Sequence, residues 1–302
     1  MKALKEHYVR RIEELRKERN AVILAHVYQI DDIQDIADFV GDSLELSRKA
    51  VDTDADTIVF CGVRFMAETA AILNPDKIVL LPEMDASCEL ADMAAVEELK
   101  KIRKLYPEAA VVSYVNSSAA IKAESNVCCT SANAVEVVNN LGQNQILFVP
   151  DRNLGSHVAE RTGKDIIKWN GYCYVHEKIG LSTIKELKQL HPDAELMVHP
   201  ECTKPVRDIA DYVGSTAQML VYAAKGESKE FIVGTEDGLI HTLQKANPNK
   251  KFYPVTTCCR GMKRINLEEV STSLEKMRFK IDVRKNVKAK AKRALERMLV
   301  CK

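Results

Sequence analysis

The sequence predicts an α/β protein made of three homologous small domains, each a three-layer αβα unit with a parallel sheet. The first observation is a near repeat: DIADFVGDS, starting at Asp35, recurs as DIADYVGST, starting at Asp208. A further copy follows from the likeness of KLYPEAAVVSYVN, which ends at Asn116, to QLHPDAELMVHPE, which ends at Glu201. Self-similarity at fixed spacings indicates repeated structural units.

The second observation is that each copy has the same order of elements. A first apolar strand (AVILA, AVVSY or ELMVH) precedes an amphipathic helix, a loop with a hydroxyl residue and a second helix (LELSRKAV, NAVEVVNNL or AQMLVYAA). A second strand (TIVFCG, ILFVPD or EFIVGT), another helix and a third strand (KIVLLPE, DIIKWNG or KKFYPV) follow. Continuous apolar strands that alternate with helices favour parallel sheets covered on both faces. We expect the three units to lie about a pseudo-threefold axis, with ligands bound beyond the carboxyl ends of the strands.

The repeats divide the chain into four segments. Residues 1–104 are expected to hold an N-terminal helix and the first repeat, 105–189 the second repeat, 190–267 the third, and 268–302 a helical tail. The tail is strongly basic, with the sequence RKNVKAKAKRALERMLVCK. We interpret this charge run as the solvated face of a helix.

Composition excludes several classes of protein. The 302 residues are 46% hydrophobic and carry a formal net charge of +1, which gives no global attraction to nucleic acid or to an anionic membrane. The apolar stretches are too short to span a bilayer, and the charged N-terminal segment does not resemble a secretory signal. We therefore expect a cytoplasmic protein, in which the nine cysteines are reduced and suited to metal binding or catalysis.

One cysteine follows the third strand in each copy. These are Cys88, Cys173 and Cys259, at nearly equal spacings along the chain. Three equivalent thiolates can meet at one point, where they suit an iron–sulfur cube with one iron left free as a Lewis acid. A catalytic zinc site, with three ligands and a water, is the competing interpretation. Spacing does not decide between Cys258 and Cys259, and Cys61 is expected in the core. Four further cysteines have no assigned role: Cys128, Cys129, Cys202 and Cys301.

The first strand of each copy ends in two polar residues at alternate positions. The pairs are His26 and Tyr28, Tyr114 and Asn116, and His199 and Glu201. Alternation places both members of a pair on one side of the strand, so three pairs can line one pocket with hydrogen-bond donors and acid–base groups. A single pair of this kind is more often a buried polar group with a structural partner.

Hydroxyl residues occupy matching positions at the starts of helices in the three copies. They are Ser43, Ser131 and Thr216. One interpretation is simple N-capping of the helix. The other is an anion site, because a helix N-terminus offers unpaired N–H groups to a carboxylate or phosphate. The sequence leaves both open.

Together these motifs resemble the quinolinate synthase family. The matching strings are AHVYQ, DIADFVGDSLELS, MAETA, LNPDKIVLLP, SYVNSSA, TSANAVEVV, GYCYVH, MVHPEC and CCRGM. The resemblance implies three α/β domains about a pseudo-threefold axis and an oxygen-sensitive [4Fe-4S] cluster bound through three cysteines. It also implies condensation of iminoaspartate with dihydroxyacetone phosphate to quinolinate, phosphate and water, in de novo NAD biosynthesis. The free iron is then expected to act as the Lewis acid in dehydration.

The resemblance also implies roles for individual residues. Cys88, Cys173 and Cys259 match the cluster ligands, and Cys259 satisfies the family pattern of a cysteine, one residue and then Gly-Met. The implied substrate-binding set is His26, Ser43, Tyr114, Asn116, Ser131, His199, Glu201 and Thr216. The implied catalytic set is Tyr28, His199 and Glu201, with Tyr28 and Glu201 as the proton-transfer groups. His176, in GYCYVH, is a further candidate near the cluster.

Three alternative functions remain. A diphthamide-synthesis-like radical S-adenosylmethionine enzyme also has three repeats and three cysteines, but does not require the polar pairs. A non-catalytic iron–sulfur sensor is expected to carry a DNA-binding module, for which the sequence has no sign. A zinc hydrolase is the third. For the implied enzyme, the expected partners are its two small-molecule substrates and the enzyme that supplies iminoaspartate, with no nucleic acid and no membrane.

Overall fold

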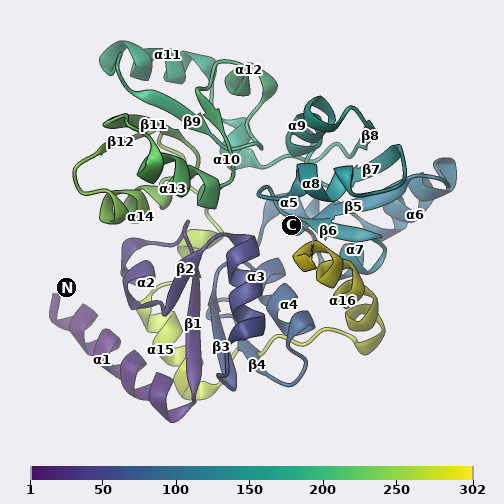
Figure 1. Ribbon diagram of the computed structural model, residues 1–302. Coiled ribbons are helices and arrows are strands. Elements are labelled where there is room, and N and C mark those ends of the chain that lie inside the picture. Colours follow the sequence, from purple (N-terminus) through teal and green to yellow (C-terminus); the bar gives the residue numbers. More distant parts are fainter. Residues whose placement is uncertain (1, 301–302) are drawn as a thin grey trace.

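The computed structural model describes residues 2–300 and contains three α/β units around a common centre (Figure 1). Each unit repeats the same order of elements. The first comprises α1 (Lys2–Glu18), β1 (Ala21–His26), α2 (Asp31–Ile36), β2 (Phe39–Gly41), α3 (Ser43–Asp52), β3 (Thr57–Cys61), α4 (Arg64–Leu73), β4 (Ile78–Leu80) and α5 (Glu89–Asp92). The second comprises α6 (Val96–Leu105), β5 (Ala110–Tyr114), α7 (Ala119–Ala123), β6 (Val127–Cys129), α8 (Ala134–Asn139), β7 (Gln145–Val149), α9 (Arg152–Thr162), β8 (Asp165–Lys168) and α10 (Tyr174–Glu177). The third comprises α11 (Leu181–Leu190), β9 (Glu195–Val198), α12 (Lys204–Arg207), β10 (Tyr212–Val213), α13 (Thr216–Lys225), β11 (Glu230–Gly234), α14 (Leu239–Ala246), β12 (Lys251–Pro254) and the 3-10 turn η1 (Met262–Arg264).

The three sheets have one topology. Their strand orders are β2-β1-β3-β4, β6-β5-β7-β8 and β10-β9-β11-β12, and every pairing is parallel. The predicted α/β class with three αβα units is therefore confirmed. Each sheet has one strand more than the sequence predicted, because β2, β6 and β10 are only two or three residues long. Such short segments show no apolar pattern, and Cys128 and Cys129 lie in one of them.

Near the start of the first strand of each unit, the same reciprocal pair of hydrogen bonds occurs, and we call this pair the polar clamp. Asp38 donates its backbone N–H to Ile23 O at 2.9 Å, and its carboxylate accepts Ile23 N–H at 2.8 Å. The same reciprocal bonding joins two further pairs, Asn126 with Val111 and Asp211 with Leu196. Because the clamp fixes the same point of each strand, the register of all three sheets places the carboxyl ends of β1, β5 and β9 at equivalent points.

The helix before the second and third sheets packs into the core of that sheet. Leu99 of α6 packs with Val111 of the second unit, and Ile184 of α11 packs with Leu196 of the third. We therefore propose that the second and third units begin at these helices, near residues 96 and 181, ahead of the boundaries expected at 105 and 190.

The C-terminal segment joins units together. Helix α15 (Leu267–Lys276) packs against α1, and α16 (Lys285–Val300) packs against α4, α7 and β6. One face of α16 is buried through Ala291, Ala294, Leu295 and Met298, while most of its basic side chains are exposed. The charge run is thus the outer face of a helix whose inner face is part of the core. Cys301 lies outside the described residues, and within residues 2–300 no helix has the length and apolarity needed to cross a membrane.

Candidate active site

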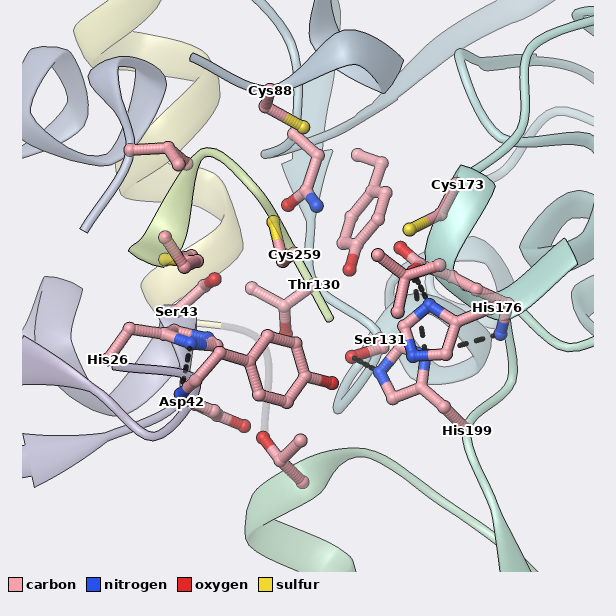
Figure 2. A pocket seen from close by; sticks show the side chains of 18 of the residues that line it. His26, Asp42, Ser43, Cys88, Thr130, Ser131, Cys173, His176, His199 and Cys259 are labelled. Atoms are coloured by element: carbon pink, nitrogen blue, oxygen red, sulfur yellow. Dashed lines mark hydrogen bonds and ion pairs between the residues drawn. The ribbon is translucent and has the colours of Figure 1, made fainter. Parts of the chain in front are cut away.

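One pocket receives residues from all three units, and Figure 2 shows it from close by. It is lined by every member of the implied substrate-binding, catalytic and cysteine sets. These residues are His26, Tyr28, Ser43, Cys88, Tyr114, Asn116, Ser131, Cys173, His199, Glu201, Thr216 and Cys259. His176 lines it as well. The residues that were selected at strand ends therefore lie in one pocket, as expected for the carboxyl ends of equivalent parallel strands.

Two histidines in the pocket have the same fixed orientation. His26 Nδ1 accepts the backbone N–H of Tyr28 at 3.1 Å, and His199 Nδ1 accepts that of Glu201 at 3.3 Å. A ring nitrogen that accepts a hydrogen bond carries no proton, so the proton of each neutral ring is on Nε2. His199 Nε2 lies 3.1 Å from Ser131 Oγ. The turn after the strand thus converts each histidine into a hydrogen-bond donor within the pocket.

Both of these rings are neutral at physiological pH. Burial, with a contribution from the positive charge of Lys263, lowers the pKa of His26 to about 3. Burial and the neighbouring His176 lower the pKa of His199 to about 3. Neutral imidazole retains the single-donor tautomer that the backbone bonds impose.

A chain of polar groups beside the pocket connects Tyr28 of the first unit with Glu201 of the third. Tyr28 Oη lies 2.6 Å from Thr235 Oγ1, which lies 2.8 Å from His176 Nε2. His176 Nδ1 lies 2.6 Å from Glu201 Oε2, and the His176 ring stacks on the ring of His199 at 4.4 Å. These contacts join a phenol, a hydroxyl, an imidazole and a carboxylate. Such a series can move a proton between its ends.

The charges along this chain are well defined. Burial alone would raise the pKa of Glu201, but the contact with His176 outweighs burial and holds that pKa below its ordinary value, so the carboxylate is ionised. Burial raises the pKa of Tyr28 well above its ordinary value, so the phenol keeps its proton. One end of the chain is therefore a base and the other an acid.

Two buried atoms in the pocket have unused hydrogen-bonding capacity. Asn116 Oδ1 and Glu201 Oε1 make no hydrogen bond to the described residues. Buried polar atoms without partners are costly and rare. Their concentration in one pocket indicates a site built for a polar ligand.

The hydroxyl residues at the helix starts are not caps. The cap of α3 is Asp42, which precedes Ser43, and the cap of α13 is Ser215, which precedes Thr216. Ser131 lies in the turn before α8 and contacts His199. The capping interpretation is therefore wrong for Ser43 and Thr216. Because the preceding residue caps the helix, these hydroxyls are free to line the pocket beside the N-terminal N–H groups.

The three repeat cysteines line one side of the pocket, as Figure 2 shows. Cys88 and Cys173 precede the first residues of α5 and α10, and Cys259 stands shortly before η1. Burial raises the pKa of all three thiols, and the charge of Cys259 raises that of Cys88 further. Backbone N–H groups of the following turn lower the pKa at each thiol. Cys258, in contrast, is exposed and does not line the pocket.

Comparison with known proteins identifies the family. The family model described as "Quinolinate synthetase A protein" matches residues 10–300. The chain belongs to the quinolinate synthase family. It is 55% identical over 296 residues to "Quinolinate synthase 1" of Methanosarcina acetivorans, covering 97% of both chains. It is 54% identical over 291 residues to "Quinolinate synthase" of Dehalococcoides mccartyi, covering 96% of both, and 52% identical over 294 residues to that of Thermodesulfovibrio yellowstonii, covering 96% of this chain and 97% of the relative.

Sequence reasoning missed several polar residues of the quinolinate synthase site, among them Thr235, Asp42 and Thr130. Thr235 directly follows β11, so the strand-end rule would have found it had it been applied to second strands as well as first strands. Its equivalents in the other units, Gly62 and Pro150, carry no polar side chain, so no repeated pattern marked the position. Asp42 lines the pocket too, and burial raises its pKa to about 6.

The donor set fits an iron–sulfur cluster. Three partly buried thiols from three units face one space, and ionised thiolates there repel one another unless a positively charged core holds them. Each thiol also has N–H donors from its own following turn, a favourable environment for a sulfur ligand. A different set, Cys173, His176 and Glu201, has ligand atoms within 4.8 Å of one another. In that set, His176 already contacts Thr235 through Nε2 and Glu201 through Nδ1.

Proposed function

We propose that this chain is a quinolinate synthase, a transferase that condenses iminoaspartate with dihydroxyacetone phosphate to give quinolinate, phosphate and water. The observation that carries the proposal is the pocket where three polar pairs and three cysteines from three repeats lie together. Family membership supports the same activity.

The proposed cofactor is one [4Fe-4S] cluster held by Cys88, Cys173 and Cys259. When bound, such a cluster supplies an iron with no cysteine ligand, which acts as a Lewis acid on a leaving hydroxyl. Cys259 is preferred over Cys258 because only Cys259 lines the pocket. Its neighbour Cys258 is exposed, as expected because successive residues of an extended segment point to opposite sides.

The proposed binding of the two anionic substrates uses neutral donors. His26 and His199 present Nε2–H groups, which donate hydrogen bonds to carboxylate oxygens while the imidazole rings stay neutral. Ser43 and Thr216 add hydroxyls at the first turns of α3 and α13, where N–H groups attract phosphate or carboxylate. Asn116 provides a further polar group whose carbonyl oxygen needs a partner. Tyr114 and Ser131 complete the proposed binding set.

The proposed proton transfers use the chain from Tyr28 to Glu201. Joining the substrates requires removal of a proton from the carbon of iminoaspartate that forms the new carbon–carbon bond, together with loss of phosphate. Ring closure and dehydration then require a proton for each departing hydroxyl. Glu201 is ionised and accepts a proton, with His199 beside it, while Tyr28 remains protonated and donates one. Thr235 and His176 connect the two and return each to its starting state.

A mononuclear metal enzyme is the second candidate, favoured by the grouping of Cys173, His176 and Glu201. A metal bound there would have to displace the contacts of His176 with Thr235 or Glu201, and it would leave Cys88 and Cys259 without a role. Zinc takes three such ligands in catalytic sites, so the two candidates predict different metals in the purified protein.

The activity test is a coupled assay under anaerobic conditions. Because imines hydrolyse in water, iminoaspartate is generated in the reaction from aspartate by an added oxidase. To keep the assay anaerobic, this oxidase uses an electron acceptor other than oxygen. Dihydroxyacetone phosphate is supplied directly. The proposal predicts quinolinate and inorganic phosphate in equal amounts, both dependent on iron and sulfide reconstitution. Phosphate release without quinolinate, or equal activity in a zinc-loaded, iron-free protein, would contradict it.

The lability of the imine also leads us to propose a cytoplasmic protein supplied by the enzyme that makes iminoaspartate.

A further inference from the structure

Two buried carboxyl groups lie directly behind two of the three cysteines. Asp151 Oδ2 accepts the backbone N–H of Cys173 at 3.1 Å, and Glu236 Oε1 accepts that of Cys259 at 3.0 Å. Both residues have no exposed surface, and neither lines the pocket. They therefore act on the cysteine loops from within the protein and do not touch a ligand in the pocket.

The two carboxyl groups occupy one position of the repeat. Asp151 is the second residue after β7, and Glu236 is the second after β11, the equivalent strand of the next unit. The strand registers agree, because Val149 and Gly234 pair with equivalent residues of the first strands. In the first unit the same position holds Val63, whose apolar side chain lines the pocket. The carboxyl group is thus present in the second and third units and is replaced by an apolar side chain in the first.

Each carboxyl group is fixed by a second set of bonds. Asp151 is the N-cap of α9 and accepts the backbone N–H of Leu154 at 2.7 Å. Glu236 accepts the N–H of Gly238 at 2.7 Å and pairs with Lys263 at 3.0 Å. Leu154 lies in α9 and Gly238 is the N-cap residue of α14, so the carboxyl groups connect each cysteine loop to a helix of its unit.

We propose that Asp151 and Glu236 are positioning residues for the metal cluster, each holding one cysteine ligand in place through the backbone N–H of that cysteine. The inference rests on the proposed cluster at Cys88, Cys173 and Cys259. Groups bonded behind metal ligands fix the orientation of those ligands, and their loss typically lowers metal affinity by about 10–100-fold. A change in the geometry of a cysteine ligand also alters the electronic structure of the cluster.

The test compares Asp151→Asn and Glu236→Gln with wild type. Asparagine is as good an N-cap as aspartate, so Asp151→Asn can still accept from Leu154 N–H. Its amide nitrogen then faces the N–H of Cys173, donor to donor, and only the bond to the cysteine loop is lost. The control is Asp211→Ala, which removes the carboxylate that accepts Leu196 N–H at 2.7 Å at the start of β9. Asparagine would not serve there, because Asn126 accepts the equivalent N–H in the second unit. This control removes the same kind of bond far along the strand from the pocket.

Two quantities are measured on the anaerobically reconstituted protein: the rate of iron loss to a chelator and the electron paramagnetic resonance spectrum of the reduced cluster. We expect both test variants to lose iron about 10–100-fold faster than wild type and to have altered spectra. Asp211→Ala should lower the melting temperature and change neither quantity. Wild-type rates and spectra in a folded Asp151→Asn or Glu236→Gln would overturn the inference, and either variant suffices if the other does not fold. A wild-type protein that takes up no iron and sulfide would instead refute the proposed function.

Discussion

Thr235→Val removes the hydroxyl between Tyr28 and His176 while keeping the shape of the side chain. Thr235 is 1% exposed, and its Oγ1 lies 2.6 Å from Tyr28 Oη and 2.8 Å from His176 Nε2. If the chain carries protons, its interruption should lower turnover by about 10²–10⁴-fold, the usual contribution of a general acid or base. That corresponds to about 3–5 kcal/mol in activation free energy.

The same substitution has a smaller effect on stability. It leaves the Tyr28 hydroxyl and His176 Nε2 without their partner, and an unsatisfied buried group costs about 1–3 kcal/mol. Both side chains face the pocket, where water can replace part of the loss. We therefore expect the free energy of unfolding to fall by about 1–3 kcal/mol, a decrease of a few degrees in melting temperature.

The assay is initial-rate quinolinate formation at saturating dihydroxyacetone phosphate, beside a thermal melt of each variant. The control is Thr242→Val, which removes a hydroxyl that donates to Gln34 Oε1 at 2.6 Å, outside the pocket. The control should lose comparable stability and keep its turnover. If Thr235→Val turns over as fast as Thr242→Val, the proton chain has no catalytic role and the reasoning fails.

Three other predictions follow from the same pocket. Glu201→Gln and Tyr28→Phe should each lose about 10²–10⁴-fold in turnover with little change in melting temperature; near-normal rates in both would remove them as acid and base. Thr216→Ala should raise the KM for substrate by removing a hydroxyl that no helix cap requires, and a lower melting temperature at unchanged KM would show that its role is structural. Because the folded state holds the pKa of His26 and of His199 at about 3, below the ordinary value of 6.5, the unfolded chain binds more protons between these values. The free energy of unfolding should thus fall as pH drops from 6.5 toward 3, and a double glutamine variant should flatten that dependence in urea titrations.

The parts of the site that follow a repeated pattern could be predicted from the sequence. The offset that carries Asp35 to Asp208 also carries His26 to His199 and Tyr28 to Glu201, and the common sheet register places both pairs at one pocket. The strand-end positions are polar where the neighbouring positions are apolar, so alternation alone marks them. The three-unit fold follows from the same periodicity, since each copy repeats its order of strands and helices.

The parts that break the pattern could not be predicted from the repeats. Thr235 has Gly62 and Pro150 as its equivalents, so nothing in the other copies marks it as functional. The caps Asp42 and Ser215 each stand one residue before a pocket hydroxyl. Sequence patterns do not locate the first residue of a helix to within one residue, so they could not tell the cap from the pocket residue. The buried face of α16 was obscured by its charge, because small and basic residues share the helix and only packing against α7 separates the two faces.

Iron and acid-labile sulfide analysis of the anaerobically purified chain distinguishes a [4Fe-4S] cluster from a mononuclear metal. A cluster held by Cys88, Cys173 and Cys259 predicts about four of each per chain and no zinc. The iron and sulfide should be retained in Cys258→Ser and lost in Cys88→Ser, Cys173→Ser and Cys259→Ser. A zinc-containing protein, a single iron without sulfide, or a cluster that survives in Cys259→Ser and is lost in Cys258→Ser would contradict this assignment.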